Sequence, residues 1–258
     1  MFISVPEALL YANAFGPRNA RAILAIGGWT GSWELWTDTF ALLSDSYRTI
    51  AFDHRGTGAT TCRIESITYE NLVRDVFAVM DAFGIEQCVL AGESAGAAVA
   101  MGAALAQPER FSALVLVGAL YVSEPLDGPD MFRMGLEKAY AQTVDRFVQL
   151  CLPEPDSAHF ARWGNMILNR ASQPAAIALL DMNRALDLRA RVSEIQQPTL
   201  LLHGAQDAIV PFARAEWLAQ NMPHAQLHSL PDTGHVPTIT RPAHVANAIR
   251  EFLDKQHT

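Results

Sequence analysis

Residues 88–107 carry the strongest structural signal in the chain, and their sequence is CVLAGESAGAAVAMGAALAQ. The run Cys88–Ala91 is apolar, does not alternate and is too short for a helix, which indicates a strand buried on both faces. The run Ala95–Gln107 is rich in alanine and other small residues, which predicts a helix that approaches a sheet closely. Between them, Gly92-Glu93-Ser94-Ala95-Gly96 matches the pattern G-x-S-x-G. We therefore expect a strand, a tight turn and a helix in this order.

Four further apolar runs share this character, and short helical segments separate them. The runs are Ala22–Ile26, Thr49–Phe52, Ala113–Val117 and Thr199–Leu202. Helical segments are expected at Trp33–Leu43, Tyr69–Phe83, Phe212–Gln220 and Pro242–Asp254, with a short strand near Ala225–Leu230. Alternating buried strands and helices predict an α/β fold with a mostly parallel central sheet flanked by helices.

The alternation stops between Val122 and Ile195, where no run resembles a strand. Helical segments are expected instead, at residues 131–152, 156–171 and 174–190. We interpret residues 122–195 as a helical cap inserted into a core of residues 1–121 and 196–258. The cap is rich in large apolar side chains, which either roof an apolar pocket or pack the cap on the core: Met131, Phe132, Met134, Phe147, Phe160, Trp163, Met166 and Met182.

The composition excludes several classes of protein. Of the 258 residues 50% are hydrophobic and 18% are charged, so the chain can bury a large core and is not disordered. The net charge is −8 and Lys138 and Lys255 are the only lysines, so no nucleic-acid partner is expected. No membrane span is expected, because no apolar run approaches the roughly 18 residues that such a helix needs.

Few signals point to export, metals or cofactors. Met1–Pro6 lack a basic flank and a long apolar stretch, so no signal peptide is expected. The chain has three cysteines, Cys62, Cys88 and Cys151, which cannot all pair with one another, and none lies in a C-x-x-C motif. This pattern favours reduced thiols in a cytoplasmic protein. The chain has no H-E-x-x-H and no phosphate-binding G-x-x-x-x-G-K-[ST] pattern, so we expect neither a metal nor a cofactor.

Ser94 is the candidate nucleophile. A turn this tight forces the serine into strained backbone geometry, and glycines on both sides remove side chains that would collide there. The hydroxyl is then presented at the carboxyl end of a strand, where open α/β sheets bind ligands. The N-terminus of the following helix favours developing negative charge.

A serine hydroxyl needs a base, and the base needs an orienting group. His235 is the candidate base, because it lies in a loop between the last strand and the last helix. Asp207 is the candidate acid, in a loop directly after the strand Thr199–Leu202. Glu124, shortly after another strand, and Asp232, close to His235, remain rival acids.

An oxyanion hole requires two N–H donors aimed at the developing charge. The N–H of Ala95, next after the nucleophile, is one candidate, and the N–H of Trp29 is the other. Gly27 and Gly28 would let that loop turn inward. The residues expected to contact the substrate are Gly28, Trp29, Met134, Trp163, Ile209 and Val236.

These motifs together resemble the α/β-hydrolase superfamily, in the group with a serine nucleophile and a helical cap. Gly92–Gly96 is similar to the nucleophile elbow, and residues 53–58, Asp-His-Arg-Gly-Thr-Gly, to the family's D-x-R-G-x-G loop. Pro198–Pro211 resembles the segment that bears the acid, and Gly234-His235 the histidine loop. The resemblance covers about Ala22 to Leu253. It implies the chain order nucleophile, acid, base, which Ser94, Asp207 and His235 follow.

Two positions depart from the family's pattern. The family commonly has His-Gly where this chain has Gly27-Gly28, so the support of the oxyanion loop differs. The residue before the nucleophile is often histidine, and here it is Glu93. A carboxylate at this position either disfavours anionic substrates or is bonded in the interior.

The resemblance leads to one main hypothesis about function and two alternatives. The main hypothesis is a cofactor-independent serine hydrolase that cleaves carboxylic ester or lactone bonds through an acyl-enzyme on Ser94. The first alternative keeps the triad but cleaves a C–C bond or performs perhydrolysis. The second is a non-catalytic ligand receptor or signalling protein on the same fold. The sparse charge favours a small, apolar and uncharged substrate.

Overall fold

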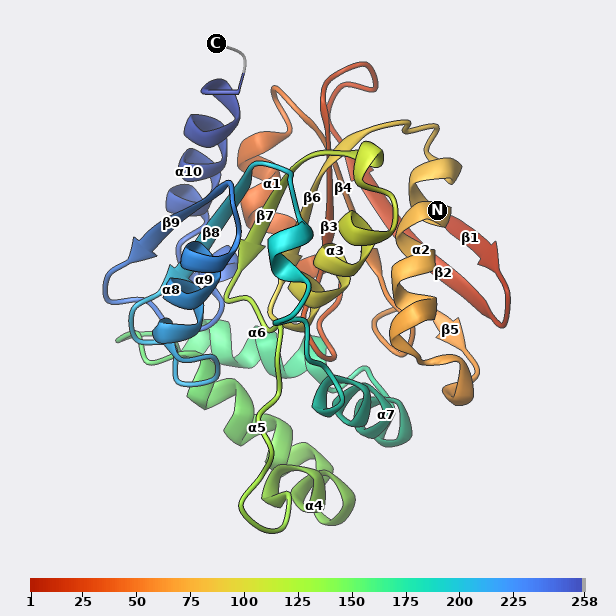
Figure 1. Ribbon diagram of the computed structural model, residues 1–258. Coiled ribbons are helices and arrows are strands. Elements are labelled where there is room, and N and C mark those ends of the chain that lie inside the picture. Colours follow the sequence, from red (N-terminus) through yellow and green to blue (C-terminus); the bar gives the residue numbers. More distant parts are fainter. Residues whose placement is uncertain (257–258) are drawn as a thin grey trace.

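The computed structural model describes residues 1–256 and has three layers, with helices on both faces of one central sheet (Figure 1). The sheet has nine strands, in the order β1-β2-β4-β3-β6-β7-β8-β9, with β5 paired to β2. The strands are β1 (Phe2–Val5), β2 (Ala8–Phe15), β3 (Ala22–Ile26), β4 (Arg48–Asp53), β5 (Thr61–Cys62), β6 (Cys88–Glu93), β7 (Phe111–Val117), β8 (Thr199–Gly204) and β9 (Ala225–Leu230). The five neighbouring pairs in the stretch β4-β3-β6-β7-β8-β9 of this order are parallel, and β5 pairs antiparallel with β2.

The predicted buried strands are confirmed. Every residue of β3, β6 and β8 is buried, because helices cover both faces of the sheet. The registers of β3 with β4 and with β6 are continuous, and Leu24 of β3 lies between Ile50 of β4 and Leu90 of β6. The register of β6 with β7 shifts once, between Cys88 and Val89. The fold class predicted from the apolar runs is therefore correct.

The antiparallel edge of the sheet was not expected from the sequence. β1 and β2 form a hairpin, and β2 pairs antiparallel with β4. Along β2 buried residues are interspersed with partly or fully exposed ones. The sequence of such a strand contains no continuous apolar run. The strands that are buried on both faces do contain one, and that run predicts them.

The helices of the core lie close to their expected positions, except for the short helix Pro237–Thr240, which the sequence did not predict. They are α1 (Thr37–Leu43), α2 (Tyr69–Ala82), α3 (Ala95–Ala106), α8 (Phe212–Asn221), α9 (Pro237–Thr240) and α10 (Pro242–Asp254). Short 3₁₀ turns occur at Trp33–Trp36, Ile64–Ser66, Pro108–Arg110 and Val192–Glu194. α1 packs against α10 on one face, and α2 packs against α3 on the other (Figure 1). α2 begins where Thr68 accepts a hydrogen bond from the N–H of Asn71.

Four helices separate β7 from β8, and we call residues 122–195 the helical insertion. They are α4 (Met131–Lys138), α5 (Tyr140–Cys151), α6 (Ala158–Leu168) and α7 (Gln173–Arg184). They gather at the carboxyl ends of the parallel strands, at the bottom of Figure 1. The single helix expected over residues 131–152 is in fact two, because Ala139 leaves the helical region with φ −152° and ψ 63°. The helix expected over 174–190 ends at Arg184, because Asp187 forms a β-bridge with Val122.

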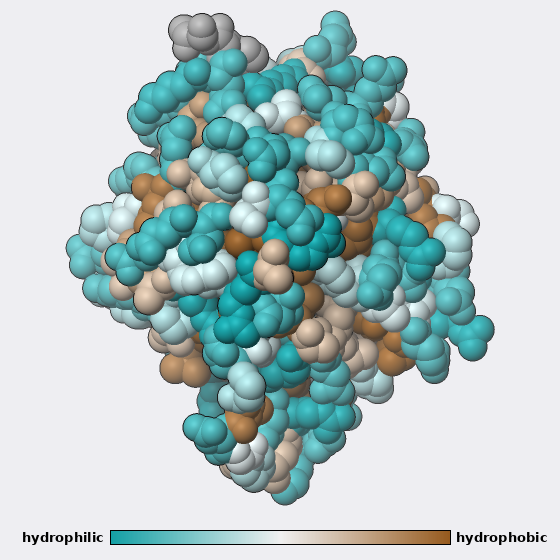
Figure 2. Space-filling view, in the orientation of Figure 1, coloured by the Kyte–Doolittle hydropathy of each residue, from teal (hydrophilic) through white to brown (hydrophobic). Residues whose placement is uncertain are grey.

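The face of the molecule drawn in Figure 2 is mostly hydrophilic. Figure 2 shows a largely polar face on which hydrophobic residues occur in small, scattered groups. Within residues 1–256, no helix is both long and apolar enough to cross a membrane.

A buried ion pair holds the loop after β4. Arg55 donates from Nε to Asp75 Oδ2 at 2.7 Å and from Nη2 to Oδ1 at 3.0 Å, and both side chains are 2% exposed. The pair links residues 53–58 to α2. A buried ion pair is stabilising only while both partners are present, since removing one leaves an uncompensated charge.

We therefore expect Asp75→Ala to lower the free energy of unfolding by about 3–5 kcal/mol. Urea unfolding followed by circular dichroism measures the change. Asp81→Ala is the matched control: it removes an aspartate of the same helix whose side chain is 68% exposed and pairs with Arg110. This control should lose much less stability. Equal losses in the two variants would contradict the role of burial.

Candidate active site

The turn between β6 and α3 places Ser94 in a conformation that few residues adopt. Its backbone has φ 54° and ψ −120°. A Cβ atom on Gly92 would lie 2.5 Å from the carbonyl oxygen of Gly96. A Cβ atom on Gly96 would lie 2.5 Å from the carbonyl oxygen of Gly27. Gly92 therefore lets the end of β6 lie against the first turn of α3, and Gly96 lets that turn approach the loop after β3. Side chains would collide at both positions, as the sequence predicted.

The three residues proposed from the sequence lie in one hydrogen-bonded chain. His235 Nε2 is 2.9 Å from Ser94 Oγ, and His235 Nδ1 is 2.7 Å from Asp207 Oδ2. Asp207 Oδ1 accepts the N–H groups of Ile209 and Val210, each at 2.8 Å. Nδ1 donates to the carboxylate, so Nε2 is free to accept the serine proton.

The environment of Asp207 keeps it ionised. Burial raises the pKa of this carboxyl, but the facing His235 and a hydrogen bond from His203 outweigh burial and hold the pKa well below its usual range. The rival acids lie elsewhere. Glu124 pairs with Arg189 at 3.5 Å, and Asp232 is an exposed turn residue with φ 50°.

The loop after β3 faces Ser94 through Gly28. A Cβ atom on Gly28 would lie 3.0 Å from Ser94 Cβ. The carbonyl oxygen of Gly28 accepts a hydrogen bond from the backbone N–H of Gly31, with a nitrogen–oxygen distance of 3.0 Å. The same oxygen lies 3.1 Å from Nε2 of His54. Because the peptide unit is planar and trans, holding this carbonyl directs the N–H of Trp29 the opposite way. Ala95 is the first residue of α3, and its N–H therefore has no partner within the helix.

His54 is a site residue that the sequence reasoning missed. Burial lowers the pKa of its imidazole, so the ring is neutral at pH 7 and carries one N–H. In the Nε2–H tautomer that group donates to Gly28, and Nδ1 lies 3.1 Å from the carbonyl oxygen of Arg55. His54 belongs to the motif at residues 53–58, but only the fold brings that loop against Gly28.

Asp53 has the structural role expected of a turn residue. Its carboxylate accepts the N–H groups of Trp33 and Ala59, each at 2.8 Å. Burial raises the pKa of Asp53 to about 6 despite these bonds. The side chain therefore ties the loop after β3 to the loop after β4.

Glu93 is buried beside the nucleophile. Its side chain is 1% exposed, and Oε1 accepts a hydrogen bond from Thr238 Oγ1 at 3.0 Å. Burial, with a smaller contribution from the charge of Asp207, raises the pKa of Glu93 to about 8. The carboxyl is therefore bonded in the interior and mostly uncharged at pH 7.

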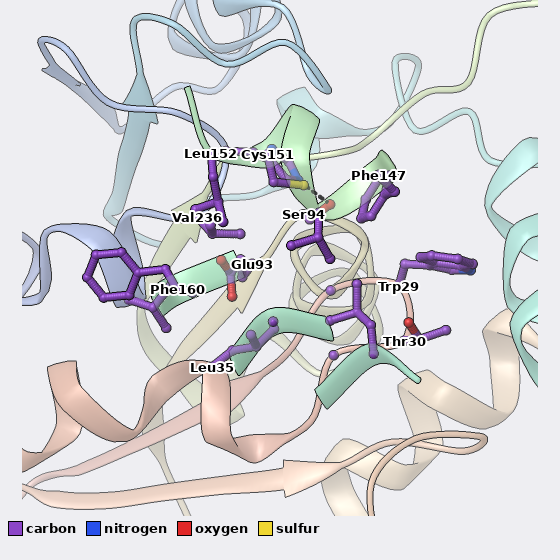
Figure 3. A pocket seen from close by; sticks show the side chains of 17 residues that line it. Trp29, Thr30, Leu35, Glu93, Ser94, Phe147, Cys151, Leu152, Phe160 and Val236 are labelled. Atoms are coloured by element: carbon purple, nitrogen blue, oxygen red, sulfur yellow. Dashed lines mark hydrogen bonds between the residues drawn. The ribbon is translucent and has the colours of Figure 1, made fainter. Parts of the chain in front are cut away.

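A mainly apolar pocket surrounds Ser94 between the core and the helical insertion. Figure 3 shows Trp29 and Phe147 to one side of Ser94 and Phe160 to the other. The lining residues are Gly28–Gly31, Leu35, Glu93, Ser94, Phe147, Val148, Cys151, Leu152, Phe160, Gly164, Leu168, His235, Val236 and Ile239. Both the core and the helices α5 and α6 contribute to it.

Only some of the residues predicted to contact the substrate line this pocket. Gly28, Trp29 and Val236 do. Met134, Trp163 and Ile209 do not, each for a separate reason. Met134 is on α4, none of whose residues lines the pocket. α6 lines the pocket through Phe160, Gly164 and Leu168, which are four residues apart on one face of the helix, and Trp163 packs against the hydrophobic core. Ile209 packs against the hydrophobic core.

Residues 1–256 contain no group of three or more His, Cys, Asp or Glu side chains that could hold a metal ion.

The sequence of the chain is similar to that of known proteins along most of its length. The family described as alpha/beta hydrolase fold matches residues 21–185, and a second family, described as TAP-like protein, matches residues 178–258. A putative carbamate hydrolase, RutD, of Variovorax paradoxus (strain S110) is 30% identical over 95% of this chain and 96% of its own. A pimeloyl-[acyl-carrier protein] methyl ester esterase of Nitrosomonas europaea is 30% identical, over 87% of this chain and 92% of its own.

A solved structure extends the comparison to three dimensions. A thermophilic esterase from Thermogutta terrifontis superposes with a TM-score of 0.90 at 25% identity, covering 100% of this chain and 99% of that one. The similarity therefore includes the helical insertion as well as the sheet.

The pKa of Glu93 predicts a pH-dependent stability. Because its pKa rises from 4.5 to about 8 on folding, the unfolded chain releases this proton first, and stability is lost as pH rises from 4.5 to 8. Glu93→Gln, which keeps the acceptor for Thr238, should remove this loss and exceed the wild type in stability at pH 8. Urea unfolding of both proteins at pH 5, 6.5 and 8 tests this. If the two stability curves remain parallel across this range, Glu93 does not titrate as expected.

Proposed function

The chain belongs to the α/β-hydrolase family and is a hydrolase, and from this premise we propose that it cleaves carboxylic ester or lactone bonds without a cofactor. The observation that carries the proposal is the chain of hydrogen bonds from Ser94 through His235 to Asp207. Such a chain turns a weak hydroxyl nucleophile into one that attacks an acyl carbon.

The proposed reaction has two steps. Ser94 Oγ attacks the carbonyl carbon while His235 Nε2 accepts its proton, and the leaving alcohol takes that proton as the acyl-enzyme forms. His235 then takes a proton from water as that water attacks the acyl carbon. His235 returns the proton to Ser94 Oγ when the bond between Oγ and the acyl carbon breaks, which releases the acid and restores Ser94. Asp207 keeps Nδ1 protonated and stabilises the positive imidazole.

The oxyanion is held, in this proposal, by the N–H groups of Trp29 and Ala95. Two features support the assignment: the Gly28 carbonyl is held on the opposite edge of the Trp29 peptide, and Ala95 begins α3. The helix N-terminus adds a favourable field for negative charge. Losing one such donor typically costs about 10²–10³ in kcat.

The helical insertion is proposed to act as a cap. In this proposal the core consists of residues 1–121 and 196–258, and the cap of residues 122–195. α5 and α6 supply Phe147, Phe160 and Leu168 to the pocket, opposite the core residues that flank Ser94. The apolar lining and the mostly uncharged Glu93 support an uncharged, apolar acyl or alcohol group as the substrate. Methyl esters and carbamates join the candidate substrates because they are named for the relatives at 30% identity.

Ser94→Ala tests the nucleophile. The variant should lose turnover of every substrate and labelling by a fluorophosphonate, while its thermal transition stays nearly unchanged, because only one half-buried hydroxyl is removed. The substrate panel contains an aryl ester, a methyl ester, a lactone, a carbamate and a ring-cleavage diketone. Peptide mapping of the labelled wild type identifies the modified residue.

Each outcome of this panel has a separate meaning. Turnover of the diketone alone would replace ester hydrolysis by C–C cleavage. Absence of turnover and labelling in the wild type would favour a non-catalytic receptor. Ester turnover retained by Ser94→Ala would overturn the proposed nucleophile.

His54→Phe tests the support of the oxyanion loop. It removes the donor to the Gly28 carbonyl but keeps a buried ring, so kcat should fall by at least about tenfold with a smaller change in KM, as expected when an interaction acts mainly in the transition state. Steady-state kinetics on the best ester of the panel measure both constants. A thermal melt confirms that the variant is folded at the assay temperature. A folded variant with wild-type kcat would show that His54 does not support the hole.

A further inference from the structure

The segment Cys151–Glu154 of the helical insertion lies directly against the loop that carries His235. The N–H of His235 donates to the carbonyl oxygen of Cys151 at 2.9 Å. The N–H of Gly234 donates to Glu154 Oε1, also at 2.9 Å. Thus two successive N–H groups of the histidine loop are bonded to the insertion.

Glu154 also holds the far side of this loop. Thr240, the last residue of α9, donates from Oγ1 to the same Oε1 atom at 2.9 Å. One carboxylate oxygen therefore joins Gly234, just before His235, to Thr240, five residues after it. Both ends of the segment that carries the ring are fixed to one point.

The two segments also pack closely at this contact. Any Cβ atom on Gly234 would overlap Pro153 Cδ and the carbonyl oxygen of Cys151. Glu154 is only 5% exposed although it is a carboxylic acid. Burying such a group is costly unless it is hydrogen-bonded, so its position depends on the donors of the histidine loop.

The insertion is tied to the opposite side of the site as well. The indole N–H of Trp29 donates to the carbonyl oxygen of Ala176 on α7 at 2.9 Å. The Trp29 ring also packs edge-on against Phe132 and Phe147, at centroid distances of 5.1 and 5.2 Å. The loops that carry His235 and Trp29 are thus both anchored to the insertion.

We propose that Glu154 is a positioning residue: through its Oε1 atom the insertion holds the histidine loop and keeps His235 Nε2 within reach of Ser94 Oγ. The inference rests on the proposed function, in which His235 is the base. It gives the insertion a task beyond covering the pocket, because a displacement of the segment Cys151–Glu154 moves the base as well as the roof.

Two substitutions at Glu154 separate its acceptor from its volume. Glu154→Gln keeps Oε1 as an acceptor, and Oε2, which it replaces, has no hydrogen-bond partner among the described residues. Glu154→Leu keeps a similar volume but removes the acceptor. We expect Glu154→Leu to lower kcat by about 10- to 100-fold, the scale of a misplaced catalytic group, with KM nearly unchanged. Glu154→Gln should stay close to the wild type.

Three readouts distinguish positioning from a general loss of stability. The first is kcat and KM, measured at least 15 °C below the thermal transition of each variant. The second is the rate at which a fluorophosphonate labels Ser94, which should fall in parallel with kcat. The third is the downfield proton resonance of His235 Nδ1–H, which should shift or broaden in Glu154→Leu and remain in Glu154→Gln. A purely structural role would lower only the thermal transition.

Thr240→Val gives a milder test if Glu154→Leu does not fold. It removes one donor to Oε1 and leaves Glu154 and Gly234 unchanged, so kcat should fall by several-fold with KM unchanged. The inference is overturned if a folded Glu154→Leu keeps the wild-type kcat and labelling rate. Where Glu154→Leu does not fold, the same result in Thr240→Val overturns it. If the wild type itself neither labels nor hydrolyses any ester, the proposed function fails instead.

Discussion

The left-handed backbone of Ser94 is the constraint on which the rest of the site depends. It exists only because β6 passes into α3 without an intervening loop, and because Gly96 lets the helix meet the carbonyl oxygens of Ile26 and Gly27. This contact brings the loop after β3 to the serine. The same parallel sheet places the loops after β8 and β9 at that edge, so His235 and Asp207 reach the serine although they lie far from it in sequence.

Around this turn, buried polar groups hold the loops in place. Asp53 accepts N–H groups from the loops after β3 and β4, and the pair Arg55–Asp75 ties the second of these loops to α2. His54, between them in sequence, lies against the Gly28 carbonyl. Burying a polar or charged group is costly unless it is hydrogen-bonded, so each of these contacts holds its loop in one conformation. Buried polar bonds therefore hold the loops that must be rigid for chemistry.

The helical insertion completes the pocket and is bonded to the loops on both sides of the serine. Its hydrogen bond to the Trp29 indole comes from α7, and those to the histidine loop come from the last residue of α5 and from Glu154, just after it. The pocket lies between these two anchors and is lined by apolar residues of α5 and α6. An insertion attached in this way shapes both what the pocket admits and where the acid–base groups stand. Sequence changes in it are thus expected to affect rate as well as specificity.

The sequence by itself determined the parallel sheet, the turn at Ser94 and the order of Ser94, Asp207 and His235, because buried runs and glycine-bounded turns are local patterns. It did not reveal the β1–β2 hairpin, whose half-exposed strands lack an apolar run. Nor did it show that Met134, Trp163 and Ile209 miss the pocket, since helix rotation and packing decide which side chains face it. The contacts of His54 and Glu154 join residues 26 and 80 positions apart along the chain. Only the tertiary structure decided them, because no local pattern encodes which distant backbone group a buried side chain will meet.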